Sequence, residues 1–361
     1  MKRLQWAGLP IGIAILIGLV LHEGVGGLMQ IIGQAGFALL WLVPFHALPL
    51  LLDAYAWHLL LGKRVSLVFL WWVATVREAV SRLLPAAGIG GEIVGIRLAG
   101  WRVADLSAVS ASVVVEVMVT MAVQYVFSAL ALVLIVAATH QVGVVRTVGV
   151  ALLLSLPLPV VAFVLVRRGG FFYAIERWAG KLLGSSSSLL LAVDGRQLDA
   201  DIDALLSRSG LLLRAFLWQL SGYLLGALET YWALALLGHS VSLTGALAIE
   251  GLTQAVRHAA FFVPAGVGVQ DAAVVLLAQL FGVDREVALS LALVKRMREV
   301  LFGCAALVSW QGAEVFRRPG ERFASPLGIT RPPADAMNAY RPAEPGRTFE
   351  RGVTDQGTDA R

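Results

Sequence analysis

The sequence has little of what a soluble enzyme needs. Only 15% of its 361 residues are charged, and its one cysteine, Cys304, lies in an apolar run as a small packing residue, so the chain forms no internal disulfide bond. It shows no nucleophile beside a base and no nucleotide-binding loop, which argues against an enzyme. We predict neither a metal site nor a cofactor, because the histidines form no ligand pair on one helix face: His22, His46, His58, His140, His239 and His258.

Apolar residues dominate what is present. They make up 58% of the chain, and the mean hydropathy is +0.77, which is too apolar for a soluble core. The runs repeatedly reach the roughly 20 residues that a helix needs to cross a bilayer. We therefore predict an all-α, polytopic integral membrane protein. The net charge of +5 is explained by basic cytoplasmic loops and not by a nucleic-acid partner.

Basic residues set the predicted topology, because they favour the cytoplasmic side. They place both termini in the cytoplasm. The predicted apolar segments are 9–21, 35–52, 66–84, 89–100, 106–136, 148–166, 211–237, 243–263, 272–281 and 286–310.

Composition divides the chain into four parts. Residues 1–166 and 210–316 are two transmembrane halves, joined by a cytoplasmic or interfacial linker at 167–209. Within the linker, residues 171–183 suit a helix lying in the headgroup layer, and Asp199, Asp201 and Asp203 stand early in a second helix. Residues 317–361 have little apolar content and are predicted to be a disordered cytoplasmic tail.

Each half contains a helix that breaks at proline and glycine. The stretch 254–271, QAVRHAAFFVPAGVGVQD, sets a cation in an apolar run, breaks it and ends on a carboxylate. Residues 76–92 are a weaker copy about 180 positions earlier, and a second match at an offset of 183 aligns Glu116 with Glu299. The predicted breaks are formed by Pro85, Gly88, Gly90, Gly91, Pro264, Gly266 and Gly268.

The repeat and the charges together predict an inverted topology. The first broken helix pair enters from the cytoplasm and the second from the opposite face, as in the inverted repeats of transporters. Broken helices are tolerated at membrane depth only where protein or water covers them. Two of them facing each other would enclose a polar pocket, although a helix kink without a ligand is an alternative for each proline.

Charged residues inside the apolar helices are the candidate site. Glu116 and Glu299 each lie about 15 Å along their helices, near the middle of a hydrocarbon layer roughly 30 Å thick. Such a charge costs at least about 2.5 kcal/mol unless it is paired or faces a wet cavity. Two hypotheses follow: contact with a substrate, or interhelical ion pairs with Arg77, Arg257 or Lys295. The predicted substrate-binding residues are Arg77, Arg82, Glu92, Glu116, Arg257, Gln270, Asp271, Lys295, Arg298 and Glu299.

Three motifs carry a family resemblance. REAVSRLLPAAGIGGEIVG, QAVRHAAFFVPAGVGVQD and LALVKRMREVLFG resemble the hopanoid-biosynthesis-associated membrane protein group HpnL, within the wider family similar to the transmembrane region of lysylphosphatidylglycerol synthase. The resemblance covers about residues 4–316. It implies a bacterial inner-membrane protein acting on lipids, since that transmembrane module is associated with moving a modified lipid between leaflets. Unlike the synthase, this sequence has no room for a soluble catalytic domain after residue 317.

The sequence is therefore compatible with three functions. The first is translocation or transfer of a membrane lipid, a hopanoid or a phospholipid, in which Arg77, Arg82 and Arg257 hold a phosphate or a hydroxyl-rich headgroup. The second is an intramembrane enzyme that modifies a lipid headgroup, with acid and base work by Glu116 or Glu299. The third is a scaffold that gathers hopanoid biosynthesis enzymes. The oligomeric state is not predicted.

Overall fold

The structure is a computed structural model of the whole chain, and it describes residues 36–84, 90–139, 143, 149–150, 153–174, 177, 194–259 and 269–316. The described residues are helical or lie in turns between helices. In chain order these are η1 (Gly36–Trp41), α3 (Leu42–Leu60), α4 (Leu67–Leu83), α5 (Gly90–Ala99), α6 (Leu106–Thr139), α8 (Pro157–Arg167), α10 (Gly195–Leu206), α11 (Ser209–Leu236), α12 (Leu243–Ala259), α13 (Val269–Leu280) and α14 (Arg285–Phe316).

Three helices in this part of the chain are long and apolar enough to cross a membrane. They are Gly36–Leu60, Leu106–Ala138 and Ser209–Leu236, and most of each span is not buried inside the protein. Large apolar side chains such as Val133, Leu154 and Val308 point outward instead. A surface of this kind is stable in lipid and would aggregate in water. The prediction of a multi-pass helical membrane protein is therefore confirmed.

Several helices begin where a polar side chain caps free backbone amides. Asp105 Oδ1 accepts the Ala108 N–H at 3.1 Å before α6, and Ser242 Oγ accepts the Gly245 N–H at 3.1 Å before α12. Asp194 caps α10 in the same way through the Arg196 N–H. These oxygens satisfy amides that have no partner inside the helix. The polar residues between the apolar runs thus fix where the long helices start.

Where the structure describes them, most helix ends lie within a few residues of the predicted segments, and the predicted segment 9–21 lies outside the described residues. The segments predicted at 35–52 and 286–310 continue to Leu60 and Phe316. After Leu60 the chain turns at Gly62, whose backbone φ of +67° favours glycine. The predicted segment ended at Leu52, directly before Asp53. In the structure Asp53 lies inside α3 and lines an internal cavity, so the charge does not face acyl chains.

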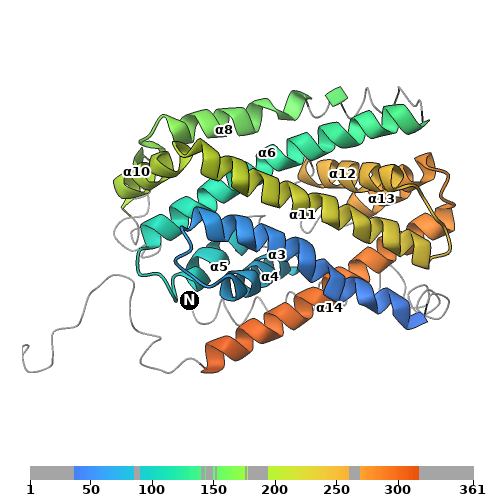
Figure 1. Cartoon of the computed structure of the whole chain (residues 1–361), viewed down its shortest axis with the longest axis horizontal. Helices are drawn as coiled ribbons and strands as arrows, with labels where there is room; N and C mark the ends of the chain where they lie inside the picture. The colour runs from blue at the N-terminus through green and yellow to red at the C-terminus, as the bar shows by residue number, and fades with distance from the viewer. Residues whose placement is uncertain are drawn as a thin grey trace, which may run out of the picture.

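Helices of the first half pack against helices of the second half. Helix α3 packs against α11, α4 packs against α14, and α12 packs against α6, while α4–α5 and α12–α13 each pack as a pair. Figure 1 shows these two pairs on either side of the crossing long helices. Helices α5 and α13, of 10 and 12 residues, are about 15 and 18 Å long, shorter than a hydrocarbon layer of about 30 Å.

The linker helix α10 packs against α6, α8 and α11. Asp199 accepts the backbone N–H groups of Phe172 and Tyr173, at 3.3 and 3.2 Å, and so ties the start of the linker to α10. The second linker helix is present as α10, but the prediction that Asp199, Asp201 and Asp203 stand early in it is wrong, because all three lie beyond its first turn, where Asp194 is the cap. Of the predicted headgroup-layer helix, the structure describes 171–174 and 177, and the rest lies outside the described residues, as does the tail.

Candidate functional site: a charged chamber between the helices

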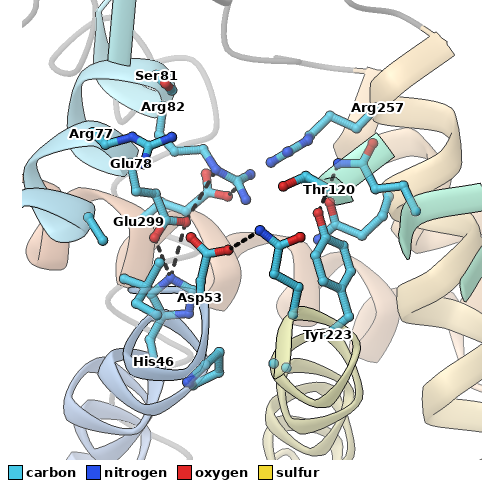
Figure 2. Close-up of a pocket in the computed structure, with 18 of the residues that line it drawn as sticks. His46, Asp53, Arg77, Glu78, Ser81, Arg82, Thr120, Tyr223, Arg257 and Glu299 are labelled. Atoms are coloured by element: carbon cyan, nitrogen blue, oxygen red, sulfur yellow. Dashed lines mark hydrogen bonds and ion pairs between the residues drawn. The ribbon is translucent and has the colours of Figure 1, made fainter. Parts of the chain in front are cut away.

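A cavity of about 420 Å³ lies where the two halves meet. It is lined from α3, α4, α5, α6, α11, α12, α13 and α14, and thus from both predicted repeats. Arg257, Glu116 and Glu299, which the sequence predicts to share one chamber, all line it. Figure 2 shows His46 and Asp53 on one side of this space, with Arg82 and Arg257 pointing into it from opposite sides.

Arg77 is the centre of the first ion-paired cluster. Its Nη1 donates to both carboxylate oxygens of Glu116, at 2.8 and 3.1 Å, and its Nη2 donates to Glu92. Its guanidinium carbon lies 4.8 Å from the centroid of the Trp57 ring, within the range of a cation–π contact. Glu116 is 2% exposed. This geometry is the interhelical ion pair that the sequence left as one of two hypotheses.

His46 joins two carboxylates and a cation in the second cluster. Its Nε2 lies 3.0 Å from a Glu78 oxygen, and its Nδ1 lies 3.0 Å from a Glu229 oxygen. Arg298 Nη1 lies 2.5 Å from Glu229 Oε1 and 2.8 Å from the same His46 nitrogen. Helices α3, α4, α11 and α14 are thereby linked at one point inside the membrane.

Glu299 lies within ion-pair distance of two arginines of α14 and of one arginine from the other half. It accepts from Arg82 Nη1 at 2.9 Å and from Arg296 Nη1 at 3.0 Å, and lies 3.7 Å from Arg298. Arg296 also donates two hydrogen bonds of 2.9 Å to Asp271, so this pair braces α13 against α14. Arg82 belongs to α4, and its bond to Glu299 therefore connects the two halves.

Lys295 and Glu250 form a third cluster. Lys295 Nζ donates to Glu250, which also accepts the Thr230 hydroxyl at 2.7 Å and the Gln254 amide at 2.8 Å. Burial of these groups inside a membrane is tolerable because each polar atom has a partner.

Two charges facing the chamber have no ion pair in the described part of the chain, Arg257 and Asp53. Arg257 has no hydrogen bond or ion pair to any described residue, whereas Arg77, which the predicted repeat aligns with it, has two carboxylate partners. Asp53 accepts one hydrogen bond, from Gln219 Nε2 at 3.1 Å, and faces no cation within ion-pair distance. An unpaired ion at membrane depth is costly, so these two positions are where a ligand would act.

The predicted site residues fall into three groups. Arg77, Arg82, Glu92, Glu116, Arg257, Gln270, Lys295, Arg298 and Glu299 line the chamber, whereas Asp271 does not line it and binds Arg296. Of the predicted helix-break residues, Gly90 and Gly91 begin α5. The others, Pro85, Gly88, Pro264, Gly266 and Gly268, lie outside the described residues.

Sequence reasoning missed several chamber residues that carried the same signal it used elsewhere. Asp53 in LPLLLDAYAW, Glu229 in LLGALETYWA and Glu250 in ALAIEGLTQ each interrupt an apolar run, as Glu116 does. His46 gave a weaker signal, because one imidazole in an apolar run is not costly when neutral. Gln219 and Tyr223 gave none. Among the described residues, no group of His, Cys, Asp or Glu is arranged to hold a metal ion.

These features define a class of protein. Long helices with apolar outer faces enclose a chamber lined by ion pairs from both halves, which is the construction of a multi-pass membrane protein with an internal polar site. The chain belongs to the family of the lysylphosphatidylglycerol synthase transmembrane region, whose model matches residues 5–306. No curated protein and no solved structure matches the chain. This family links the protein to lipid modification or translocation.

Proposed function

We propose that the protein moves a lipid between leaflets or membranes, with an acidic part of its headgroup bound by Arg257 while its tails stay in the bilayer. The observation that carries the proposal is that Arg257 lines a chamber of otherwise paired cations and has no carboxylate partner in the described part of the chain. A phosphate oxygen is the natural acceptor for a guanidinium, because the forked donors match its geometry. Arg82, which points into the same space, is the second donor.

The cavity and the outer surface suit the two ends of a lipid. A chamber of about 420 Å³ is large enough for a polar headgroup. The apolar outer faces of α6 and α11 are compatible with acyl or hopanoid tails beside them. The hopanoid as substrate, association with hopanoid biosynthesis enzymes and residence in a bacterial inner membrane are parts of the proposal taken from the resemblance of the three polar motifs.

The reciprocal packing supports a mechanism of alternating access. If the halves are inverted repeats, α4–α5 and α12–α13 are matching hairpins that approach the chamber from opposite faces of the membrane. The bond between Arg82 and Glu299 joins these halves, so its rearrangement would accompany opening to one side. Rocking one half against the other then exposes the same headgroup site alternately.

The experiment reconstitutes the purified protein in vesicles of phosphatidylethanolamine and phosphatidylglycerol that carry a fluorescent phosphatidylglycerol. The rate at which the label reaches the outer leaflet is measured by its bleaching with a membrane-impermeant reductant. We expect Arg257→Gln to lower this rate about tenfold, because it removes a charge-assisted hydrogen bond of roughly 1.5–3 kcal/mol. Arg257→Lys keeps the charge and should retain part of the rate.

Arg214→Gln is the matched control, since Arg214 is exposed on α11 and forms no ion pair with the described residues. A wild-type rate equal to that of empty vesicles, for both this label and a labelled hopanoid, would refute lipid translocation. In a bacterial strain that lacks the protein, an altered set of hopanoid species without redistribution between membranes would favour the headgroup-modifying enzyme instead.

A further inference from the structure

The chamber carries an excess of negative charge. Among the described residues it is lined by seven carboxylates and five cations, so with a neutral His46 its fixed charge is two negative. Residues 85–89 and 260–268, which lie outside the described residues, include no charged side chain in the sequence. A phosphate entering the chamber would make the excess larger. Since like charges at membrane depth repel strongly, an anionic headgroup needs a cation to accompany it.

Asp53 is the carboxylate at which this cation is missing. Charged and titratable groups on four neighbouring helices act on Asp53: Arg77 and Glu78 of α4, Glu92 of α5, Glu116 of α6 and Tyr223 of α11. From α14, Arg298 contacts His46, which lies on the same helix as Asp53. Arg77 is already bound by Glu92 and Glu116. Asp53 is therefore surrounded by more negative than positive charge.

The hydrogen bonds of Gln219 indicate which cation would bind at Asp53. The Gln219 side chain is 1% exposed and lines the chamber, and its Nε2 donates to Asp53 Oδ1, but no described residue donates a hydrogen bond to its Oε1. A buried carbonyl oxygen without a donor is costly. A proton on Asp53 Oδ2 would supply that donor, because a carboxylic acid and an amide form two hydrogen bonds side by side. A metal ion would need several oxygen ligands, and among the described residues no group of three or more His, Cys, Asp or Glu side chains is arranged to hold one.

We infer that Asp53 and Gln219 form a proton-binding site whose proton enters and leaves together with the lipid headgroup. Hydronium in the chamber delivers the proton to Asp53 Oδ2 and leaves as water, so no oxidant or other reactant is needed. The proton removes one negative charge from the lining and thereby favours an anion at Arg257. By thermodynamic linkage, an anion bound at Arg257 raises the affinity of Asp53 for the proton by the same factor. This inference rests on the proposed lipid movement and names a proton gradient as its energy source.

The first test imposes a pH gradient on the vesicles described above. If one proton moves with each lipid, one unit of pH shifts the steady-state ratio of labelled phosphatidylglycerol between leaflets about tenfold, since 1.4 kcal/mol is a factor of ten. Asp53→Asn mimics the protonated state and should still move lipid, but without response to the gradient. Asp203→Asn is the matched control, because Asp203 is exposed on α10. An unchanged response in Asp53→Asn would overturn the inference, as would a gradient effect that requires sodium in place of choline.

The second test does not depend on transport. Infrared spectra of the purified protein, recorded across a pH titration, should show the carbonyl stretch of a buried protonated carboxyl group, and this band should be absent in Asp53→Asn and shifted in Gln219→Leu. An identical titration in both variants and the wild type would overturn the proton site. If the wild type moves no lipid but the band behaves as expected, the proposed function fails while the proton site stands.

Discussion

Individual residues in the chamber are held at membrane depth by partners from other helices. Arg77 and Glu116 are both buried, on α4 and α6, and their two hydrogen bonds replace the water that each group would have outside. The attraction between such a pair only offsets the cost of burial, so removing one partner is far more damaging than removing both.

Glu116→Gln tests this statement. It leaves Arg77 with Glu92 alone, and we expect a loss of about 3 kcal/mol of stability, near the lower end for breaking a buried pair. Thermal unfolding in detergent should show a clearly lowered midpoint, and the double variant with Arg77→Gln should lose less than the sum of the two. Glu314→Gln is the control, because its partner Arg97 is 45% exposed and such pairs contribute about 0–1 kcal/mol. Equal midpoints for Glu116→Gln and Glu314→Gln would contradict the expected cost.

At the scale of elements, the short helix α5 lies against α4 through glycines. A Cβ atom on Gly91 would stand 2.5 Å from the carbonyl oxygen of Arg77, and one on Gly95 would stand 2.6 Å from the Arg77 side chain. The glycines therefore allow α5 to come close enough for Glu92 to reach Arg77. The sequence identified the glycine cluster as a helix break, whereas Gly91 also serves this close packing.

Gly91→Ala should separate the two helices. Because an added Cβ would clash with the Arg77 backbone as well as with the Ser81 hydroxyl, we expect a cost of about 1–3 kcal/mol, typical of overpacking. The unfolding midpoint in detergent should fall, and lipid movement should fall with it as Glu92 leaves Arg77. Gly312→Ala is the matched control in α14, where an added Cβ would meet nothing within 4 Å and should slightly stabilise the helix. A midpoint for Gly91→Ala at or above that of this control would show that α5 is not packed as described.

At the scale of the whole molecule, the orientation of the two halves in the membrane is set by the side that each loop faces, and the contacts between the halves do not determine it. Basic residues predict that the loop at Arg64 and the turn at Ser207 face the cytoplasm, and that the turn at Ser240 faces the opposite side. All three are exposed in the structure. The opposed orientation of the two broken helix pairs follows only if this assignment holds.

Single cysteines at these positions, introduced with Cys304→Ser, test the orientation. A membrane-impermeant maleimide added to intact bacterial spheroplasts should label Ser240→Cys, and should label Arg64→Cys and Ser207→Cys only after the membrane is opened. Labelling of Arg64→Cys and Ser240→Cys from the same side would exclude the predicted topology, and with it the inverted repeat. Cys304→Ser alone reports the background.

The sequence by itself determined that the protein is helical and lies in a membrane, and it located most helices within a few residues. Apolar run length and the placement of glycine and proline are local properties, so they can be recognised without the fold. The same holds for the charges that interrupt these runs, which pointed to Glu116, Arg257 and Glu299. The segment predicted at 35–52 ended one residue before Asp53, so this carboxylate was not recognised as a charge inside a helix.

Only the tertiary structure decided which of these charges neutralise one another. Glu299 lies on the helix that the predicted repeat aligns with that of Glu116, yet it binds Arg82 of the other half and two arginines of its own helix, so Arg257 keeps no partner among the described residues. Pairing depends on how helices from distant parts of the chain cross, and spacing within one helix does not contain that information. The two unpaired groups on which the proposals rest, Arg257 and Asp53, therefore became visible only in the folded chain.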